Sequence, residues 1–153
     1  MRVVGLFSRR GYNIDSLSVS VTEDPEISRI TIVVSSEVHF LDQIILQIEK
    51  LVDVIRVFEM PSDSSLQREL ALVKVSATDE NRRSVIELSE IFKGKVVDVS
   101  PKTLTVQIVG GMERIREFLK LMRGYGVCEM VCTGMTAMER GEQTLAEMAY
   151  AEY

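Results

Sequence analysis

Residues 95–109, KVVDVSPKTLTVQIV, decide the class of fold that this sequence predicts. The residues from Thr103 onwards alternate between apolar and polar, which is typical of a strand with one face in a core. Its apolar positions are Leu104, Val106 and Ile108. Pro101 suits the second position of a type I turn between Ser100 and Thr103. The stretch therefore predicts two antiparallel strands joined by a tight turn.

One helix and one further strand pattern lie on each side of this hairpin. In chain order they are a strand over 69–77, a helix from about 80 to 92, a helix between Gly111 and Gly124, and a strand over 127–132. The side chains expected to face the core are Val85, Leu88, Ile91 and Phe92 in the first helix, and Met112, Ile115, Phe118, Leu119 and Met122 in the second. The order β-α-β-β-α-β is that of a ferredoxin-like split β-α-β unit.

Residues 1–60 follow the same order but begin with a helix. An apolar stripe at helical spacing is followed by Gly11, which stands where a helix-terminating glycine is common. The stripe consists of Val3, Val4 and Phe7. The later elements are strands over 13–21 and 28–35, a helix with Val38, Leu41, Ile44, Ile45, Ile48 and Leu51 on one face, and a strand over 53–60. This order, α-β-β-α-β, lacks only the first strand of the unit.

The first strand of this half is therefore expected to be missing from the chain. That strand is central in a ferredoxin-like sheet, so its absence is expected to leave two strand edges unpaired. The loss of its buried side chains removes roughly 5–9 kcal/mol, which is comparable to the total stability of a domain. We therefore do not expect the first half to fold well alone.

A Ser-rich stretch with one proline, MPSDSSLQ at residues 60–67, separates the halves and is expected to contain a linker over 61–67. The predicted fold class is thus α+β, with two ferredoxin-like units in tandem. Their expected bounds are residues 1–61 and 68–141. Residues 142–153 form a tail that is expected to be a short helix or disordered.

Composition places the chain among globular proteins and argues against several partners. The 153 residues are 46% hydrophobic and 27% charged, with a formal net charge of −5. Because no basic block is longer than a pair, nucleic acid is not an expected partner. Apolar runs are far shorter than the roughly 20 residues that span a bilayer, and no signal-peptide pattern opens the chain. The sequence predicts no membrane partner and no export.

No group of side chains has the spacing of a catalytic or metal site, so neither is predicted. His39, the only histidine, stands near the start of a helix, and no catalytic role is expected of it. Cys128 and Cys132 belong to an alternating strand pattern and are expected to be buried thiols. The pair Arg82 and Arg83 is expected to be solvated. A binding or regulatory module is favoured over an enzyme.

Several motifs resemble, in order and spacing, the small regulatory subunit of acetohydroxyacid synthase, also called acetolactate synthase. They are GLFSRRGYNIDSLSVSVTEDPEISRITIVV (5–34), LVDVIRV (51–57), RELALVKV (68–75), EIFKGKVVDVSPKTLTVQIVG (90–110) and TGMTAMERG (133–141). The likeness runs from about Arg2 to Gly141 and covers both halves.

The resemblance implies an N-terminal ACT domain, a fold that senses amino acids, followed by a smaller α/β domain. It implies a non-catalytic chain that binds the catalytic subunit, raises its activity and confers feedback inhibition by branched-chain amino acids, above all valine. It also implies a homodimer of paired ACT domains. No cofactor is expected in this chain, whereas thiamine diphosphate, Mg²⁺ and FAD are expected on the catalytic subunit. The expected location is the cytoplasm, or the plastid stroma in an alga or plant.

The resemblance further implies an effector site between two ACT domains, with Tyr12, Asn13 and Ile14 in one wall. An amide side chain donates and accepts hydrogen bonds, which suits the charged ends of an amino acid, and Ile14 suits an aliphatic side chain. The other wall is usually an Asn-x-x-Gly-x-Leu loop, which this sequence does not contain. A simpler interpretation is that Asn13 merely follows Gly11 in a turn, where asparagine is common.

An alternative function stays open at this point. The chain could be a free-standing ACT-type domain that binds amino acids or a partner and never meets a synthase. An in-frame strand ending in Asn-x-x-Gly-x-Leu upstream of Met1 in the gene would favour the regulatory subunit.

Overall fold

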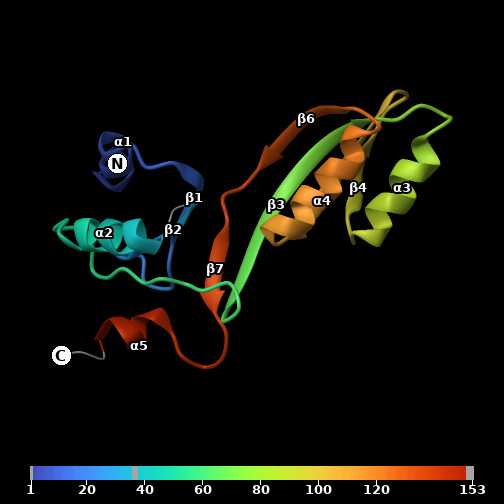
Figure 1. The fold of residues 1–153 in the computed structure, drawn as a ribbon. Coiled ribbons are helices and arrows are strands. Elements are labelled where there is room, and N and C mark those ends of the chain that lie inside the picture. The colour runs from blue at the N-terminus through green and yellow to red at the C-terminus, as the bar shows by residue number, and fades with distance from the viewer. Residues whose placement is uncertain (1, 36–37, 151–153) are drawn as a thin grey trace. The chain divides into compact units, whose positions relative to one another are not determined.

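The computed structural model describes residues 2–35 and 38–150, apart from the side chains of residues 38, 39, 149 and 150 (Figure 1). The chain divides into two compact units. The N-terminal unit comprises Met1–Leu66 and Ala137–Tyr153, and the C-terminal unit comprises Gln67–Thr136. The chain therefore passes between the units twice, once after residue 66 and once after residue 136.

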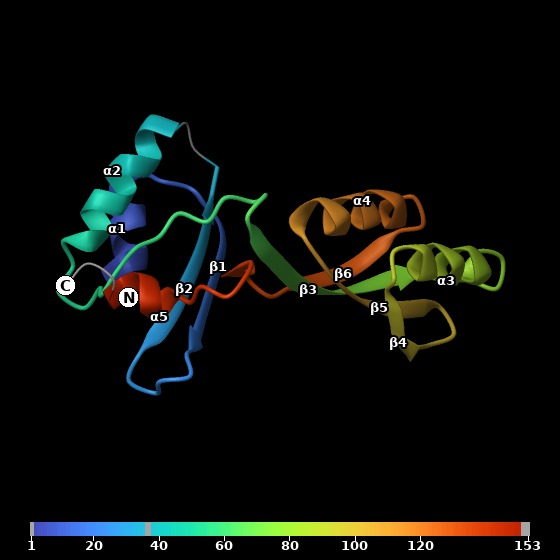
Figure 2. The ribbon, with the colours of Figure 1, turned by 90° about the horizontal axis from the view of Figure 1, so that it is seen from below.

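An antiparallel sheet with two helices forms the C-terminal unit (Figure 2). In chain order its elements are β3 (Ser65–Ser76), α3 (Arg82–Ile91), β4 (Lys95–Val99), β5 (Thr103–Gly110), α4 (Met112–Arg123) and β6 (Val127–Cys132). The strands lie in the order β4-β5-β3-β6, and β3 pairs antiparallel with both of its neighbours. The predicted β-α-β-β-α-β unit and its hairpin over 95–109 are thus confirmed.

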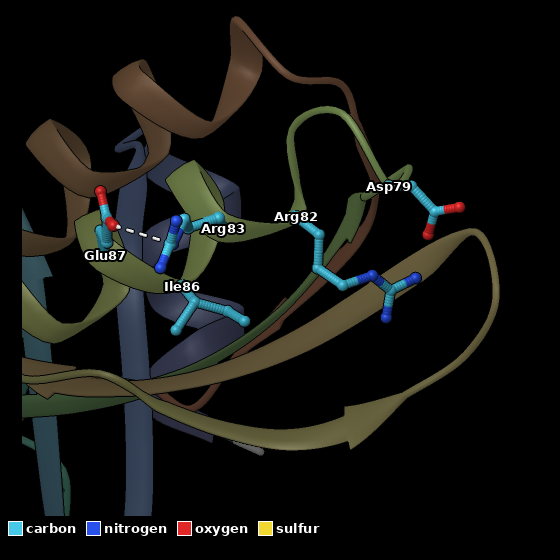
Figure 3. A pocket seen from close by; sticks show the side chains of 5 residues that line it. All are labelled: Asp79, Arg82, Arg83, Ile86 and Glu87. Atoms are coloured by element: carbon cyan, nitrogen blue, oxygen red, sulfur yellow. Dashed lines mark ion pairs between the residues drawn. The ribbon is translucent and has the colours of Figure 1, made fainter.

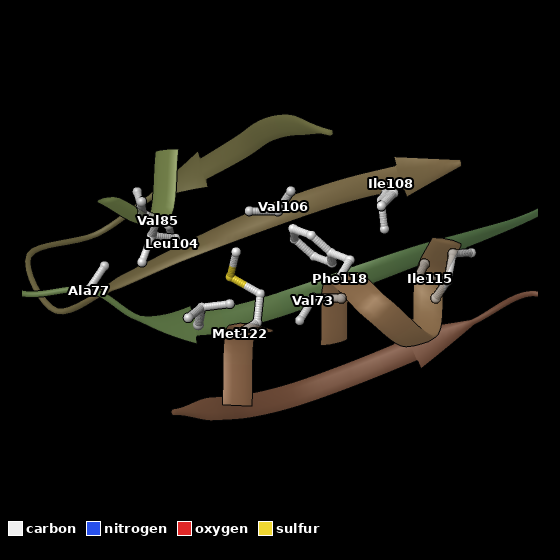
Figure 4. Close-up of a cluster of buried hydrophobic side chains, with 11 residues drawn as sticks. Val73, Ala77, Val85, Leu104, Val106, Ile108, Ile115, Phe118 and Met122 are labelled. Atoms are coloured by element: carbon white, nitrogen blue, oxygen red, sulfur yellow. The ribbon is translucent and has the colours of Figure 1, made fainter. Parts of the chain in front are cut away.

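Alternate side chains of β3 and β5 pack against α3 and α4 and form the core of this unit (Figure 4). Its buried members are Ala71, Val73, Val75, Ala77, Val85, Leu104, Val106, Ile108, Ile115, Phe118 and Met122. Phe118 meets Phe92 edge to face, with the ring centroids 5.6 Å apart. Burial at about 1.5–3 kcal/mol for each large side chain is what holds the two helices on the sheet.

One predicted core position in α3 is wrong. Ile91 is 73% exposed, whereas Ser89 is buried. Val85, Ser89 and Phe92 follow each other at helical spacing on one face, and Ile91 lies off that face. The Ser89 hydroxyl donates to the Val85 carbonyl at 2.7 Å, so a polar residue is buried there without an unsatisfied group.

The prediction of buried thiols is also wrong, because Cys128 and Cys132 are both exposed. They lie in β6, which ends the path of the sheet beside β3. Every β6 residue from Cys128 onwards is exposed, since the buried core lies over β3 and β5 instead. Alternation in a sequence shows which residues share a face, but not whether another layer covers that face.

The N-terminal unit contains a two-stranded antiparallel sheet with two helices packed on one face (Figure 1). Its first four elements are α1 (Arg2–Arg10), β1 (Ile14–Val21), β2 (Ser28–Val34) and α2 (Val38–Glu49). Phe7, Ile44 and Ile48 are buried at the centre, and half-buried side chains of both strands pack around them. The predicted helix, hairpin and second helix are confirmed.

Residues 53–60 do not form a strand, contrary to the prediction. A strand is defined by its ladder of hydrogen bonds, and within the described residues no strand pairs with this segment. Val54 and Val57 nonetheless pack against the core of the N-terminal unit. The apolar character that predicted a strand therefore reflects in part the burial of these two side chains, while Ile55 between them is 60% exposed.

The two ends of the C-terminal unit also differ from expectation. β3 begins at Ser65, inside the stretch expected as a linker, and the Ser65 hydroxyl donates to the Pro61 carbonyl at 2.7 Å. Further along, β7 (Thr136–Glu139) pairs with β3 and was not predicted. The tail contains a short helix, α5 (Leu145–Tyr150).

Candidate functional site

The end of α1 sets the position of the candidate effector residues. Gly11 adopts a left-handed conformation, with a φ of 70°. Its N–H donates to the Ser8 carbonyl at 3.3 Å, and the Tyr12 N–H donates to the Phe7 carbonyl at 3.0 Å. The two bonds form a Schellman motif, which ends α1 and leads the chain directly into β1.

Tyr12, Asn13 and Ile14 lie together in this passage from α1 to β1. The Tyr12 ring packs edge-on against Phe7, with the centroids 6.1 Å apart, and Ile14 pairs with Val34 of β2. Both side chains join the core of the unit. Asn13 between them is exposed, and we find no hydrogen bond from its side chain to the residues that the structure describes.

Asn13 thus presents an exposed amide, whereas the Tyr12 and Ile14 side chains beside it are half-buried against the core. The amide oxygen of Asn13 can accept from an ammonium group, and its nitrogen can donate to a carboxylate. A small zwitterion with an apolar side chain matches that combination. The neighbouring Asp15 carboxylate accepts a hydrogen bond from the Ser35 hydroxyl, so it is already engaged.

A metal site and a membrane-spanning helix have no support among the residues that the structure describes. Among those residues no group of three or more His, Cys, Asp or Glu side chains is placed to hold a metal ion. None of the described helices is long and apolar enough to cross a membrane. His39 belongs to α2, and its side chain lies outside the described residues.

A hollow of about 400 Å³ lies beside α3 in the C-terminal unit (Figure 3). Its lining residues are Asp79, Arg82, Arg83, Ile86 and Glu87. Arg83 is solvated, as predicted, and pairs with Glu87 one turn later at 3.7 Å. Arg82 instead donates to the Ser100 and Pro101 carbonyls at 2.8 and 2.9 Å. Arg82 is thus engaged by the β4–β5 turn, whereas Arg83 makes only an exposed ion pair.

Two arginines therefore have roles that the sequence did not reveal. Arg82 is half-buried and holds the turn between β4 and β5, so the expectation that it is solvated is wrong. Arg29 of β2 donates to the Ala137 carbonyl, which lies 108 positions along the chain, at 2.6 Å. The one signal for Arg29 is a cation within an otherwise apolar and hydroxylic strand, SRITIVV. No comparable signal marks Arg82.

Glu69, Arg116 and Cys132 interact electrostatically in the C-terminal unit. Partial burial raises the pKa of the Glu69 carboxyl, and the Arg116 guanidinium opposes that shift. Partial burial also raises the pKa of the Cys132 thiol, with a further contribution from the charge of Glu69. A raised thiol pKa lowers the thiolate fraction, so Cys132 is a poor candidate for a nucleophile.

The fold defines a protein of two α+β units, and the family match identifies the first unit as an ACT domain. Residues 1–56 match the family described as "AHAS small subunit-like ACT domain", and residues 68–141 match the one described as "Small subunit of acetolactate synthase". The chain is similar to the acetolactate synthase isozyme 3 small subunit of Salmonella typhimurium, with 41% identity over 145 residues, 94% of this chain and 89% of that protein.

The probable acetolactate synthase small subunit of Methanothermobacter thermautotrophicus is 46% identical over 145 residues, which are 94% of this chain and 86% of that protein. The crystal structure of the acetolactate synthase small subunit from Thermotoga maritima superposes with a TM-score of 0.81 at 36% identity, covering 93% of this chain and 89% of that one. This chain belongs to the acetolactate synthase small subunit family. The resemblance and the α+β fold class are confirmed, whereas the effector residues stay a prediction.

Proposed function

We propose that this chain is the non-catalytic regulatory subunit of acetolactate synthase. In this role it binds the catalytic subunit, raises its activity and makes it sensitive to feedback inhibition by a branched-chain amino acid, above all valine. The match to small subunits over 94% of the chain carries the proposal, since it spans both units. We also propose a cytoplasmic location, in keeping with bacterial and archaeal relatives.

The effector site proposed in this chain consists of Tyr12, Asn13 and Ile14. Support comes from the free amide of Asn13 and from the apolar side chains that flank it. The Schellman motif fixes the backbone there, so the site is held in place before a ligand arrives. A branched aliphatic side chain would contact Ile14, while the charged ends of the amino acid would bind the amide.

No cofactor is proposed for this chain. We expect thiamine diphosphate, Mg²⁺ and FAD to bind to the catalytic subunit instead. We also infer that two copies of this chain associate through their ACT domains. Within the described residues β1 and β2 pair only with each other, so each has an unpaired edge that another strand can extend.

Reconstitution with the cognate catalytic subunit tests the proposal. Two forms are compared, this chain and a form extended by an N-terminal strand that ends in the Asn-x-x-Gly-x-Leu loop. We expect both to raise synthase activity and the extended form to confer valine inhibition. Because allosteric coupling is typically only about 1–3 kcal/mol, loss of the loop's contacts is enough to abolish inhibition in the shorter form.

Asn13→Ala in the extended form tests the site itself. It should weaken valine inhibition, while Gln43→Ala, which removes an exposed amide of α2, should leave inhibition unchanged. Full valine sensitivity in the Asn13→Ala variant would place the pocket elsewhere. If neither form alters synthase activity, the regulatory role fails and a free-standing amino-acid-binding domain becomes the better explanation.

A further inference from the structure

Arg29 lies on the face of the β1–β2 hairpin that is opposite to α1 and α2. Ile32, three positions further along β2, packs with the helices. Because successive side chains of a strand point to opposite faces, Arg29 points away from the helices. The guanidinium donates to the Ala137 carbonyl at 2.6 Å, and the same nitrogen lies 3.9 Å from the Met60 sulfur. Arg29 therefore contacts Ala137, where the chain re-enters the N-terminal unit, and Met60, in the segment that leads to the end of its first part at Leu66.

The two segments of the N-terminal unit that lead to and from the C-terminal unit are hydrogen-bonded to each other. The Arg140 N–H donates to the Ser64 carbonyl at 3.0 Å, and β7 pairs with β3. Within the first of these segments, the Ser65 hydroxyl donates to the Pro61 carbonyl at 2.7 Å. The two segments are thus hydrogen-bonded to each other inside the N-terminal unit, beside the places where the chain leaves and re-enters it.

The contact of Arg29 with Ala137 is a hydrogen bond with a charged donor. A hydrogen bond from a charged donor is stronger than one between neutral groups. Arg29 is half-buried, and the acceptor residue Ala137 is buried. Loss of the guanidinium would leave a buried carbonyl with one partner fewer, which destabilises that place in the fold.

The hairpin connects this contact with the candidate effector site. Ile14, beside Asn13, pairs with Val34 at one end of the ladder, and Arg29 pairs with Ser20 near the other end. We propose that Arg29 is a positioning residue that holds β7 on β2 and thereby transmits effector binding to the segments that lead into the C-terminal unit. This inference rests on the proposed feedback function.

Three variants test the role of Arg29. Arg29→Met keeps the length of the side chain and removes the donor, and Arg29→Lys keeps the charge. Arg2→Met is the matched control, because Arg2 belongs to the same unit and makes an exposed ion pair with Asp53. Each is measured in two assays, amide hydrogen exchange of the free chain, and valine binding and inhibition in the extended form with the catalytic subunit.

Amide exchange decides whether Arg29 holds β7. In Arg29→Met we expect the amides of residues 138–140 to exchange about tenfold faster, with exchange in β4 and β5 unchanged. Arg29→Lys should show a smaller increase, and Arg2→Met none. Unchanged exchange at residues 138–140 would overturn the proposal.

Calorimetry and kinetics decide whether that contact transmits the effector. We expect Arg29→Met to bind valine within about threefold of the unaltered affinity and to lose at least half of the maximal inhibition. Intact inhibition despite faster exchange would overturn the coupling, and so would a parallel loss of valine affinity. If the unaltered extended form binds no valine, the feedback function itself fails, and with it the transmission, while the exchange measurement still decides the anchoring of β7.

Discussion

A Cβ atom on Gly94 would lie 3.0 Å from Cγ1 of Val106, a contact so tight that the valine side chain would have to shift by a few tenths of an ångström. It would also lie 3.2 Å from the Ser89 carbonyl oxygen, which cannot move without disturbing α3. The left-handed residue that ends α3 is Lys93, with a φ of 56°. Gly94 is therefore required for the close approach of the chain to β5 rather than for its backbone conformation.

Gly94→Ala should destabilise the C-terminal unit by about 1–3 kcal/mol, the usual cost of overpacking a core. Chemical denaturation followed by circular dichroism measures the change. In Gly111→Ala the added Cβ meets its nearest atom only at 3.9 Å, so any loss there reports the preference for glycine over alanine at the N-cap of α4 and not crowding. Equal stability of Gly94→Ala and the unaltered chain would show that the Val106 side chain of β5 shifts enough to accommodate the added methyl group.

Arg82 and Arg83 are adjacent, yet they should differ in their effect on stability. Arg82→Met removes bonds to the carbonyls of Ser100, Pro101 and Ala77, so we expect a loss of about 1.5–3 kcal/mol. Arg83→Met removes only an exposed ion pair worth about 0.3–0.5 kcal/mol. Thermal unfolding of both variants compares them directly. A similar small loss in both would mean that the β4–β5 turn holds its shape without Arg82.

Features that depend on local spacing could be predicted from the sequence. The hairpin over 95–109 follows from alternation and a suitable proline, and Gly11 follows from its place after a helical stripe. Both devices act within a few residues, so no knowledge of distant partners is needed. The placement of Tyr12, Asn13 and Ile14 beside a fixed helix end depends on the same local device.

Features that depend on distant partners could not be predicted in this way. Residues 53–60 have the composition of a strand but no described strand beside them. Cys128 and Cys132 lie on β6, at the end of the sheet path, where every residue from Cys128 onwards is exposed. The bond from Arg29 to Ala137 joins residues 108 positions apart. In each case the outcome depends on which segment the fold brings alongside, and a single sequence does not state that.

The hairpin of the N-terminal unit should exchange its amide hydrogens faster than the sheet of the C-terminal unit. β3 is bonded on both sides, by β5 and β6, whereas β1 pairs only with β2 within the described residues. We expect protection to be lower by at least about a hundredfold in β1 than in β3 at low protein concentration. Mass spectrometry of peptic peptides measures it. Equal protection at every dilution would contradict the unpaired edges.

The stability of the C-terminal unit should depend on pH through Glu69. Burial raises the pKa of this carboxyl in the folded chain above 4.5, so folding favours the protonated form. The stabilisation that folding gains from the protonated carboxyl is therefore present below pH 4.5 and is lost as pH rises through the raised pKa of Glu69. The stability advantage of Glu69→Gln should grow over that interval, with Glu90→Gln, at an exposed position, as the control. A pH-independent difference in urea midpoints would refute it.

Helix α5 should lose its order as pH falls, because Thr144 and Glu147 cap it reciprocally. The Thr144 N–H donates to the Glu147 carboxylate at 2.9 Å, and the Glu147 N–H donates to the Thr144 hydroxyl at 3.2 Å, which is a capping box. The backbone bond from Thr144, and then its side chain, hold the pKa of Glu147 below 4.5. The stabilisation is therefore present above pH 4.5 and is lost as pH falls through the lowered pKa.

Backbone chemical shifts of residues 145–148, followed from neutral to acidic pH, measure this change. They should move from helical towards random-coil values in the unaltered chain. Glu147→Gln retains an acceptor that does not titrate, so its helix should be independent of pH over the same range. Glu147→Ala should be less helical at every pH. Helical shifts that persist at acidic pH in the unaltered chain would mean that packing, rather than the bond between Thr144 and Glu147, fixes the start of α5.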